Sequence, residues 1–298
     1  MELIKIKGNT YYIDAPTNIG VYVFKNKNCL LVDTGINNSQ AKKIDELLIK
    51  NNLHPKYIVN THSHIDHCGG NNYFKENYPG CLTYTSCNEK LFMENPELTS
   101  IMLSNSIPIK GLDRITKINS VDFVLDYGIN KINDEKFEVL SLKGHSQEHI
   151  GFVTPEKICF LGDALFSSEI IDKYSLPYLY SIEDSINTLN YIKDIPCDYF
   201  IISHSDKIIE QSEISTLVEH NINNINNFIK QIIDLLDGPM SKEDILHNLT
   251  ILNELPSSFT QYHLNLSSVS AFVNYLYNKD YIDCSVQDGK MYFFSKDK

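Results

Sequence analysis

The stretch Thr61-His62-Ser63-His64-Ile65-Asp66-His67-Cys68-Gly69-Gly70 holds three histidines and one aspartate within six consecutive residues. It directly follows the run Tyr57-Ile58-Val59-Asn60, which is typical of the end of a buried strand. A single histidine is usually a surface or core residue, but this density at a strand end is typical of a metal-binding loop. Imidazole and carboxylate together favour zinc, iron or manganese over calcium. The stretch therefore predicts a metal site.

The spacing divides this loop into two halves. In an extended segment, side chains two residues apart share a face, so His62 and His64 are expected to bind one cation together. Asp66 continues the same line, whereas His67 points elsewhere. We therefore predict that the first half of the loop binds one metal ion and the last half binds a second.

Three later segments repeat the pattern of an apolar strand followed by a ligand-type residue. The strands and the residues that follow them are 137–142 with His145, 157–161 with Asp163, and 199–202 with His204. In layered α/β structures, side chains at strand ends converge on a shared cleft. These three residues are therefore expected to meet the loop that begins at His62.

Alternating strands and helices near the N-terminus predict an α/β core. Short strands are expected at 11–13, 19–24 and 29–32. Asn38 or Ser39 is expected to cap a helix that ends near Lys50. Asp33 follows the third strand, where it either orients a ligand imidazole from behind or forms a turn before Gly35.

Composition and charge limit the classes of function. The chain has 298 residues and a formal net charge of −12, which disfavours non-specific binding to nucleic acid or anionic membranes. The start of the chain lacks a secretory signal, and no apolar run approaches the roughly 20 residues that span a bilayer. The seven cysteines are odd in number and never spaced as C-x-x-C, which predicts reduced thiols. We expect a cytoplasmic protein with no membrane partner.

The motif His62-x-His64-x-Asp66-His67, followed by Gly69-Gly70, resembles the signature of the metallo-β-lactamase-fold hydrolases. The resemblance covers about residues 1–237 and implies an α/β fold, the four-layer αββα sandwich of that family. A long helix predicted between Ser212 and Leu236 ends at Gly238-Pro239, which marks a domain boundary. The expected domains are therefore a catalytic domain, 1–237, and a small C-terminal domain, 240–298.

The resemblance also implies a role for each candidate ligand. One metal ion is held by His62, His64 and His145, the other by Asp66, His67 and His204, and Asp163 touches both. His149 belongs to the same motif as His145 and is expected to orient a ligand or to form a buried hydrogen bond. Around the final histidine the chain has Ser203, Ser205 and Asp206, where relatives usually have a glycine.

This ligand set predicts a hydrolase that needs no side-chain nucleophile. Two divalent cations about 3.5 to 4 Å apart can share a water molecule and lower its pKa towards neutrality, and the resulting hydroxide attacks a carbonyl or phosphoryl centre. Asp66 is predicted to accept the proton of this water, because a metal-bound carboxylate stays ionised near pH 7. We expect two zinc ions, with iron or manganese as alternatives, and an ester, thioester or lactone-type acyl substrate.

Other functions remain as alternatives. A metal-dependent endoribonuclease is the second interpretation, and a mononuclear iron persulfide dioxygenase with an overlapping ligand set is the third. True β-lactamases place another ligand where Asp163 stands, and flavodiiron-type proteins have a glutamate where His64 stands, which disfavours both. From a different class, a nucleic-acid-binding module with a vestigial metal site would bind RNA through the C-terminal domain.

Two regions bear on the substrate and on partners. Residues 88–118 show broken helical periodicity, interrupted by Pro96 and Pro108, and form either an apolar flap over the site or ordinary core. In the region 240–298, a short helix capped by Ser241 with Asp244, a helix near 262–278 and a hairpin turn at Asp288-Gly289 together resemble a winged-helix module. Its five lysines against seven acidic residues favour a structural or homodimerising role over RNA binding.

Overall fold

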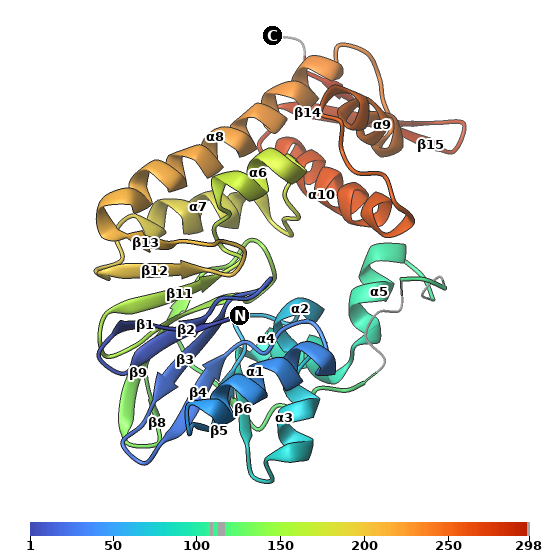
Figure 1. Ribbon diagram of the computed structural model, residues 1–298. Coiled ribbons are helices and arrows are strands. Elements are labelled where there is room, and N and C mark those ends of the chain that lie inside the picture. Colours follow the sequence, from blue (N-terminus) through green and yellow to red (C-terminus); the bar gives the residue numbers. More distant parts are fainter. Residues whose placement is uncertain (108–109, 113–116, 297–298) are drawn as a thin grey trace.

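Two β-sheets pack face to face, and helices cover the outer face of each (Figure 1). The computed structural model describes residues 1–107, 110–112 and 117–296. The predicted four-layer αββα arrangement is confirmed. Pro108, one of the two prolines that interrupt the segment 88–118, lies outside the described residues.

The first sheet has its strands in the order of the sequence. They are β1 (Leu3–Lys7), β2 (Thr10–Ile13), β3 (Ile19–Val23), β4 (Asn28–Val32), β5 (His54–Val59), β6 (Leu82–Thr85) and β7 (Phe123–Val124). From β4 onward each strand is parallel to its neighbour, so β4 and β5 end at the same edge. Helices α1 (Asn38–Lys50) and α3 (Asn71–Asn77) pack on the outer face through a core that includes Ile44, Leu48 and Phe74.

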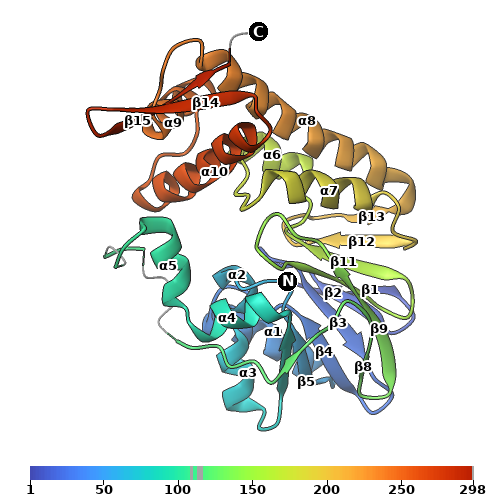
Figure 2. The ribbon, with the colours of Figure 1, turned by 180° about the vertical axis from the view of Figure 1, so that it is seen from behind.

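The second sheet has the order β13-β12-β11-β10-β9-β8. Its strands are β8 (Gly128–Ile132), β9 (Glu135–Ser141), β10 (Ile150–Val153), β11 (Ile158–Gly162), β12 (Tyr199–Ile202) and β13 (Ile208–Glu210). Strand β12 is parallel to β11, and both β9 and β11 are antiparallel to β10, so β9, β11 and β12 all point in one direction. Helices α6 (Ser168–Tyr174), α7 (Ile182–Ile192) and α8 (Gln211–Leu235) lie along its outer face (Figures 1 and 2).

Aromatic side chains fill the space between the two sheets. Phe24 and Tyr22, on the side of the first sheet, pack edge-to-face against Phe137 of β9, and Phe137 stacks on Phe152 of β10 at 4.9 Å between ring centroids. Phe137 and Phe152 are fully buried, and burying one such side chain stabilises the fold by about 1.5 to 3 kcal/mol. This core fixes the two sheets together, so the strand ends are held in one rigid frame.

Residues 88–118 contain two short helices rather than a single one. Helix α4 (Cys87–Glu94) ends before Pro96, and α5 (Glu97–Ser104) begins directly after it. Proline suits the first turn of a helix but breaks the interior, which explains the division. Helix α5 extends away from the sheets and lies beside a C-terminal helix, α10 (Phe259–Asn278), in both views (Figures 1 and 2).

The C-terminal region has the helices and the hairpin that its sequence predicts. Helix α9 (Lys242–Leu252) begins at Ser241, whose hydroxyl and backbone N–H exchange hydrogen bonds with Asp244 as a capping box. Strands β14 (Ile282–Gln287) and β15 (Lys290–Ser295) follow α10 and form the hairpin. One apolar core contains residues from both sides of the predicted boundary at 238–239, and the division into 1–237 and 240–298 stays a prediction, as does the winged-helix assignment.

One detail of the sequence-based account differs in the structure. Helix α1 is capped by Asn37, whose side chain accepts a hydrogen bond from the backbone N–H of Gln40, so the caps predicted at Asn38 or Ser39 were one or two residues late. Within the described ranges, none of the helices combines the length and the apolar character that crossing a bilayer requires.

Candidate metal centre

The seven predicted ligands lie together at one edge of the two sheets. Their side chains form two groups, which are His62, His64 and His145, and Asp66, His67, Asp163 and His204. Within each group, the atoms that could bind a metal ion all lie within 4.8 Å of one another. The strand directions explain this meeting, because β5, β9, β11 and β12 each end just before a member. We call the first set the trihistidine group and the second the carboxylate group.

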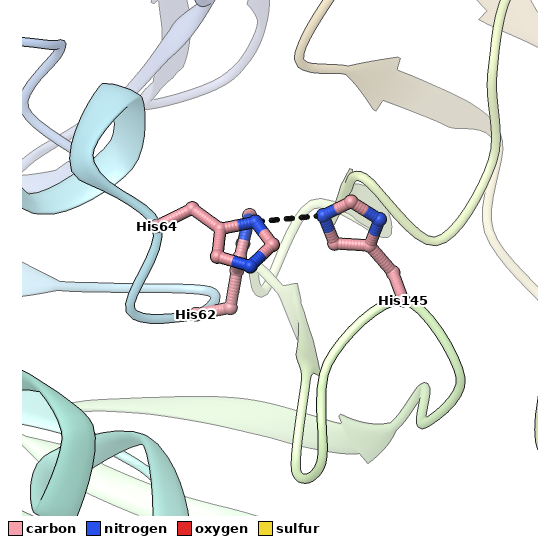
Figure 3. Close-up of side chains that lie close together, drawn as sticks. All are labelled: His62, His64 and His145. Carbon is pink, nitrogen blue, oxygen red and sulfur yellow. Dashed lines mark hydrogen bonds between the residues drawn. The ribbon is translucent and has the colours of Figure 1, made fainter. Parts of the chain in front are cut away.

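The trihistidine group brings the loop after β5 against the loop after β9. The Nδ1 atom of His64 and the Nε2 atom of His145 are 2.9 Å apart, and Figure 3 shows the two rings facing each other with His62 beside His64. The ring of His62 is 4.5 Å from that of His64 and 5.0 Å from that of His145. His62 is fully buried, whereas His64 is only partly buried.

Asp163 links the two groups. Its Oδ1 atom lies 3.3 Å from Nε2 of His67, and its Oδ2 atom lies 3.5 Å from Nε2 of His204 and 3.6 Å from Nε2 of His145. Asp66 faces the same space, with Oδ2 at 3.3 Å from Nε2 of His204. Asp163 is therefore the one carboxylate of the cluster that lies within 4 Å of imidazoles from both groups.

The loop that carries the first four residues is less extended than the sequence analysis expected. After His64 the chain turns into a short helix, α2 (Ile65–Cys68), and His64 itself is the N-cap with extended backbone angles. Asp66 therefore does not continue the line of His62 and His64, as an extended segment would require. The helical turn carries Asp66 together with His67 into the carboxylate group instead.

Three imidazoles have their outer nitrogen fixed by an oxygen behind the site. Nδ1 of His67 lies 2.8 Å from Oδ2 of Asp33. Nδ1 of His145 lies 2.9 Å from the carbonyl oxygen of Tyr178, and Nδ1 of His204 lies 2.9 Å from the carbonyl oxygen of Pro16. These oxygens only accept, so each Nδ1 carries a proton and each Nε2 is the ring nitrogen turned towards the cleft.

The same orientation follows for His62 from the hydrogen bonds of Thr61. The Thr61 hydroxyl donates its single hydrogen to Oδ2 of Asp33 at 2.9 Å, because a carboxylate accepts. The hydroxyl oxygen must therefore accept from Nδ1 of His62, which is 3.1 Å away. Nε2 of His62 then carries a lone pair, and it has no hydrogen-bond partner among the described residues.

This arrangement fits divalent cations. Nε2 of His62, Nε2 of His67 and Oδ1 of Asp163 are all buried without a hydrogen bond among the described residues, although buried polar atoms are normally paired. Imidazole nitrogens and carboxylate oxygens that converge in this way are the donors that zinc, iron and manganese accept. Buried ring nitrogens and carboxylate oxygens that face one another without a hydrogen-bond partner are stabilised when a positive charge lies between them.

Asp33 lies behind the carboxylate group and orients the imidazole of His67. The sequence left this role and a turn-forming role open. The second oxygen of Asp33 accepts the backbone N–H of Thr61 at 2.9 Å, so one buried carboxylate fixes both the start of the loop and His67. Its backbone has φ +66°, a left-handed conformation that Asp and Asn adopt more readily than other residues except glycine.

His149 is buried and makes a hydrogen bond at the centre. Its Nε2 atom accepts the backbone N–H of Asp163 at 3.1 Å. The contact requires glycine at the position before Asp163, because a Cβ on Gly162 would lie 2.5 Å from the same nitrogen, and its φ is +57°. His149 therefore positions the aspartate that links the two groups.

Sequence analysis missed Glu89, a buried carboxylate of α4 that joins the two loops of the trihistidine group. Its Oε2 atom accepts the backbone N–H of Ser63 at 2.9 Å. Its Oε1 atom accepts the hydroxyl of Ser146 at 2.6 Å and the backbone N–H of Glu148 at 3.0 Å. Only 1% of Glu89 is exposed. No motif marks it, because its partners are distant in the sequence and α4 lies in a stretch with broken periodicity.

The electrostatics of the two groups are opposite. In the trihistidine group, burial lowers the pKa of His62 and of His64, and burial together with the neighbouring His64 lowers the pKa of His145 to about 3. These three imidazoles are therefore neutral at pH 7 without a cation.

In the carboxylate group, burial alone would lower the pKa of His67 and of His204. The facing carboxylates, Asp163 first, outweigh burial, and they raise the pKa of His67 well above its usual value and that of His204 to about 10. Burial would likewise raise the pKa of Asp66 and of Asp163, but the imidazoles, His67 first, lower both. Without a cation this group holds protons where a metal ion would otherwise lie.

Comparison with known proteins agrees with this geometry. A family model described as the metallo-beta-lactamase superfamily matches residues 12–204. A hydroxyacylglutathione hydrolase 1 of Vibrio vulnificus is 27% identical over 252 residues, which cover 80% of this chain and 86% of the relative. A hydroxyacylglutathione hydrolase of Pelagibacter ubique is 30% identical over 239 residues, which cover 78% of this chain and 83% of the relative. A relative of that name from Prochlorococcus marinus is 28% identical, and that match covers 48% of each chain.

Two solved structures resemble almost the whole chain. A metallo-beta-lactamase family protein of Thermus thermophilus has a TM-score of 0.75 at 20% identity, covering 97% of this chain and 99% of that one. A beta-lactamase domain protein of Burkholderia ambifaria has a TM-score of 0.79 at 14% identity, covering 99% and 93%. At these identities the likeness shows the fold alone, and it includes the C-terminal helices and hairpin.

Proposed function

Because the chain belongs to the metallo-β-lactamase superfamily of metal-dependent hydrolases, we propose that it hydrolyses a small ester or thioester with two divalent cations, preferably zinc. One observation carries the proposal, namely that seven imidazole and carboxylate side chains from four strand ends converge in two adjacent groups. The ligand assignments made from the sequence and the number of cations are part of this proposal.

Each group would hold one cation. His62, His64 and His145 would bind the first through ring nitrogens, and Asp66, His67 and His204 would bind the second, with Asp163 between them. Bound there, two divalent cations would supply a water molecule that is acidic near neutral pH and would polarise the acyl oxygen. Asp33, His149 and Glu89 would keep the ligands aligned by the hydrogen bonds that they already make.

Asp66 would accept the proton that the attacking water loses. Its side chain is 29% exposed, more than that of Asp163 at 8%, so it faces the open part of the cleft. Its pKa is lowered because nearby imidazoles outweigh the effect of burial, so its carboxylate is ionised at neutral pH. Tyr178 borders the cleft and limits the access of solvent to His64 and His145, whose rings lie 5.4 and 5.7 Å from its own.

A thioester is the favoured substrate among the acyl compounds. The relatives from Vibrio vulnificus and Pelagibacter ubique, which match most of this chain, carry the name hydroxyacylglutathione hydrolase. A thiolate is a better leaving group than an alkoxide because the thiol is the stronger acid. Esters and lactones could be hydrolysed by the same reaction, since the leaving atom is oxygen instead of sulfur.

The alternatives that involve nucleic acid lack supporting contacts among the described residues. The open cavity beside the carboxylate group is bordered by Asp14, Glu169 and Asp206 against Lys173, an arrangement that repels a phosphodiester backbone. The C-terminal region likewise has more acidic residues than lysines. A ribonuclease and a vestigial RNA-binding module are therefore not proposed, while homodimerisation and a cytoplasmic location stay predictions.

The proposal is tested by assaying the full chain after removal of metal and after reloading with zinc, iron or manganese. The panel contains S-acyl thioesters, a lactone and a single-stranded RNA. Zinc-dependent cleavage of a thioester, with two metal equivalents per chain, is the expected result. Thioester cleavage that survives complete metal removal, or no acyl hydrolysis with any of the three metals, would refute it.

A further inference from the structure

Two cavities of different character meet at the candidate metal centre. One has a volume of about 760 Å³ and the other about 220 Å³. Both are lined by Asp66, His145, Asp163, Tyr178 and Leu264. A substrate whose reacting bond lies at Asp66 and Asp163 therefore has room for one arm in each direction.

The walls of the smaller cavity beyond the candidate ligands are mainly apolar, although the hydroxyl groups of Thr99 and Thr260 also line them. The apolar part of these walls comes from α5, from the segment after it and from α10, and is formed by Pro96, Leu103, Leu112 and Leu264. The Ser100 hydroxyl, also in this wall, donates to the carbonyl oxygen of Leu112 at 3.2 Å, so it is already satisfied. Among the described residues, the carboxylates that line this cavity are Asp66 and Asp163, both at its inner end. Such a wall is suited to an apolar group of the substrate, which is stabilised when it moves from water into the cavity.

Helices α5 and α10 form this cavity together. They lie side by side in both views, with α5 extending from the first sheet and α10 from the C-terminal region (Figures 1 and 2). Leu103 on α5 and Leu264 on α10 are both half-buried, so part of each side chain is free to contact a ligand. The C-terminal region thus contributes directly to the substrate side of the site.

The larger cavity differs by the charged side chains among its apolar ones, and more of these charged side chains are acidic than basic. Asp14, Glu169, Lys173 and Asp206 border it, and Glu169 forms an ion pair at 3.4 Å with Lys207 outside the lining. Apart from the candidate ligands, Lys173 is the one basic side chain in this lining, so a group with several phosphates would be repelled there. A neutral or zwitterionic polar group is accommodated without that repulsion.

We infer that the substrate is a thioester or ester with an apolar acyl chain in the smaller cavity and a polar carrier that lacks multiple phosphates in the larger one. The inference rests on the proposed function and narrows its substrate class. In the reaction, water adds its oxygen to the acyl carbon, the bond from that carbon to sulfur breaks, and the thiol leaves with one proton. The carboxylic acid and the free thiol are the only products, so no further reactant is needed.

The chain-length test uses zinc-loaded full chain and thioesters of N-acetylcysteamine from acetyl to hexanoyl. Filling the smaller cavity with Leu103→Trp or, on the opposite wall, Leu264→Trp should shorten the acyl group that it accepts. Ile101→Trp and Tyr262→Trp are matched controls, because both residues lie on the same helices and are 39% and 44% exposed. Two wall variants on different helices keep the test valid if one of them fails to fold.

We expect kcat/KM to rise by at least about tenfold from acetyl to hexanoyl in the parent, since a methylene in an apolar pocket is worth about tenfold or more. The hexanoyl-to-acetyl ratio should fall about tenfold in each folded wall variant and stay unchanged in both controls. A flat chain-length profile with acetyl hydrolysis intact, or an unchanged ratio in the wall variants, would overturn the inference and leave the proposed function standing. No hydrolysis of any thioester would refute the proposed function itself.

The carrier is tested with the same acyl group on N-acetylcysteamine and on coenzyme A, which carries three phosphate groups. The inference predicts a higher kcat/KM for the uncharged carrier at low salt, and a smaller difference at high salt because screening weakens the repulsion. Equal or reversed preference at low salt would overturn the assignment of the larger cavity.

Discussion

The trihistidine group and the carboxylate group lie side by side, yet the side chains that would hold a cation carry different charges in the two groups. The first consists of three neutral imidazoles, two of them buried, with no carboxylate of its own. The second sets two imidazoles against Asp66 and Asp163, with Asp33 behind His67. The trihistidine group would bind a cation through neutral ring nitrogens, whereas the carboxylate group already contains side chains of both charges.

The difference shows what each group does when no metal ion is bound. In the trihistidine group burial keeps the protons away, so a cation can enter without displacing one. In the carboxylate group the raised pKa of His67 and of His204 keeps both imidazoles protonated, and a cation must replace those protons. The two groups should therefore differ in proton release, in pH dependence and in the buried carboxylate that supports each of them.

Replacing Asp163 by Ala is expected to have the largest effect, because it is the one carboxylate of the cluster within 4 Å of imidazoles of both groups. We predict a fall in kcat of at least about a thousandfold, since metal polarisation is worth several kcal/mol, and a lower metal content. Elemental analysis and steady-state kinetics measure both. Asp198→Ala, at an exposed carboxylate paired with Lys7, is the control. Normal turnover in the Asp163 variant would contradict the role of Asp163 as the residue that links the two groups.

The pH dependence of metal binding should distinguish the groups next. His204 has a pKa raised to about 10 and that of His67 is also raised, so below these values both carry a proton that the cation displaces. Affinity at the carboxylate group should therefore rise about a hundredfold per pH unit near neutrality, from about two released protons. Affinity at the trihistidine group should change little there, because the pKa of His145 is lowered to about 3. Calorimetry in buffers of different ionisation enthalpy counts the protons, and equal release at both groups would contradict the comparison.

Asp33→Asn should weaken the carboxylate group selectively. The variant keeps the size and tolerates the φ of +66°, but it replaces one of the two oxygens that accept from Thr61 and from Nδ1 of His67. We predict a loss of about 10- to 100-fold in affinity for the second cation, as for other residues that orient ligands. Asp45→Asn, a buried carboxylate bonded to the Tyr73 hydroxyl and remote from the cleft, should leave metal affinity intact. An equal loss at both groups would show that Asp33 acts on general stability.

Glu89→Gln should have a smaller effect, confined to the trihistidine group. The amide still accepts at one oxygen but turns an N–H₂ group towards one of the donors, from Ser63 or from the loop at Ser146. About a tenfold loss of affinity for the first cation is expected, and Glu89→Ala should lose more because all three donors are then unpaired. Glu94→Gln on the same helix is the control, because within the described part of the chain its carboxylate accepts only the Val121 N–H and an amide oxygen can still do so. Loss only at the carboxylate group would contradict this assignment.

Residue patterns predicted the parts of the centre that follow strands. His145, Asp163 and His204 were recognisable because each comes directly after an apolar run, and the structure brings them together with the loop at His62. Glu89 and Leu264 were not recognisable, since their roles depend on contacts between distant segments. The turn at α2 was also missed, because side-chain spacing in an extended segment cannot show where the backbone becomes helical. Long-range packing of α5 and α10 determines the cavities, and no local pattern encodes it.

Anomalous diffraction at the zinc edge, from crystals of the zinc-loaded full chain, tests the central claim most directly. We predict two peaks per chain, one bonded by His62, His64 and His145 and the other by Asp66, His67 and His204, with Asp163 touching both. The expected separation is about 3.5 to 4 Å. A single peak, or zinc bound away from these seven side chains, would contradict the account.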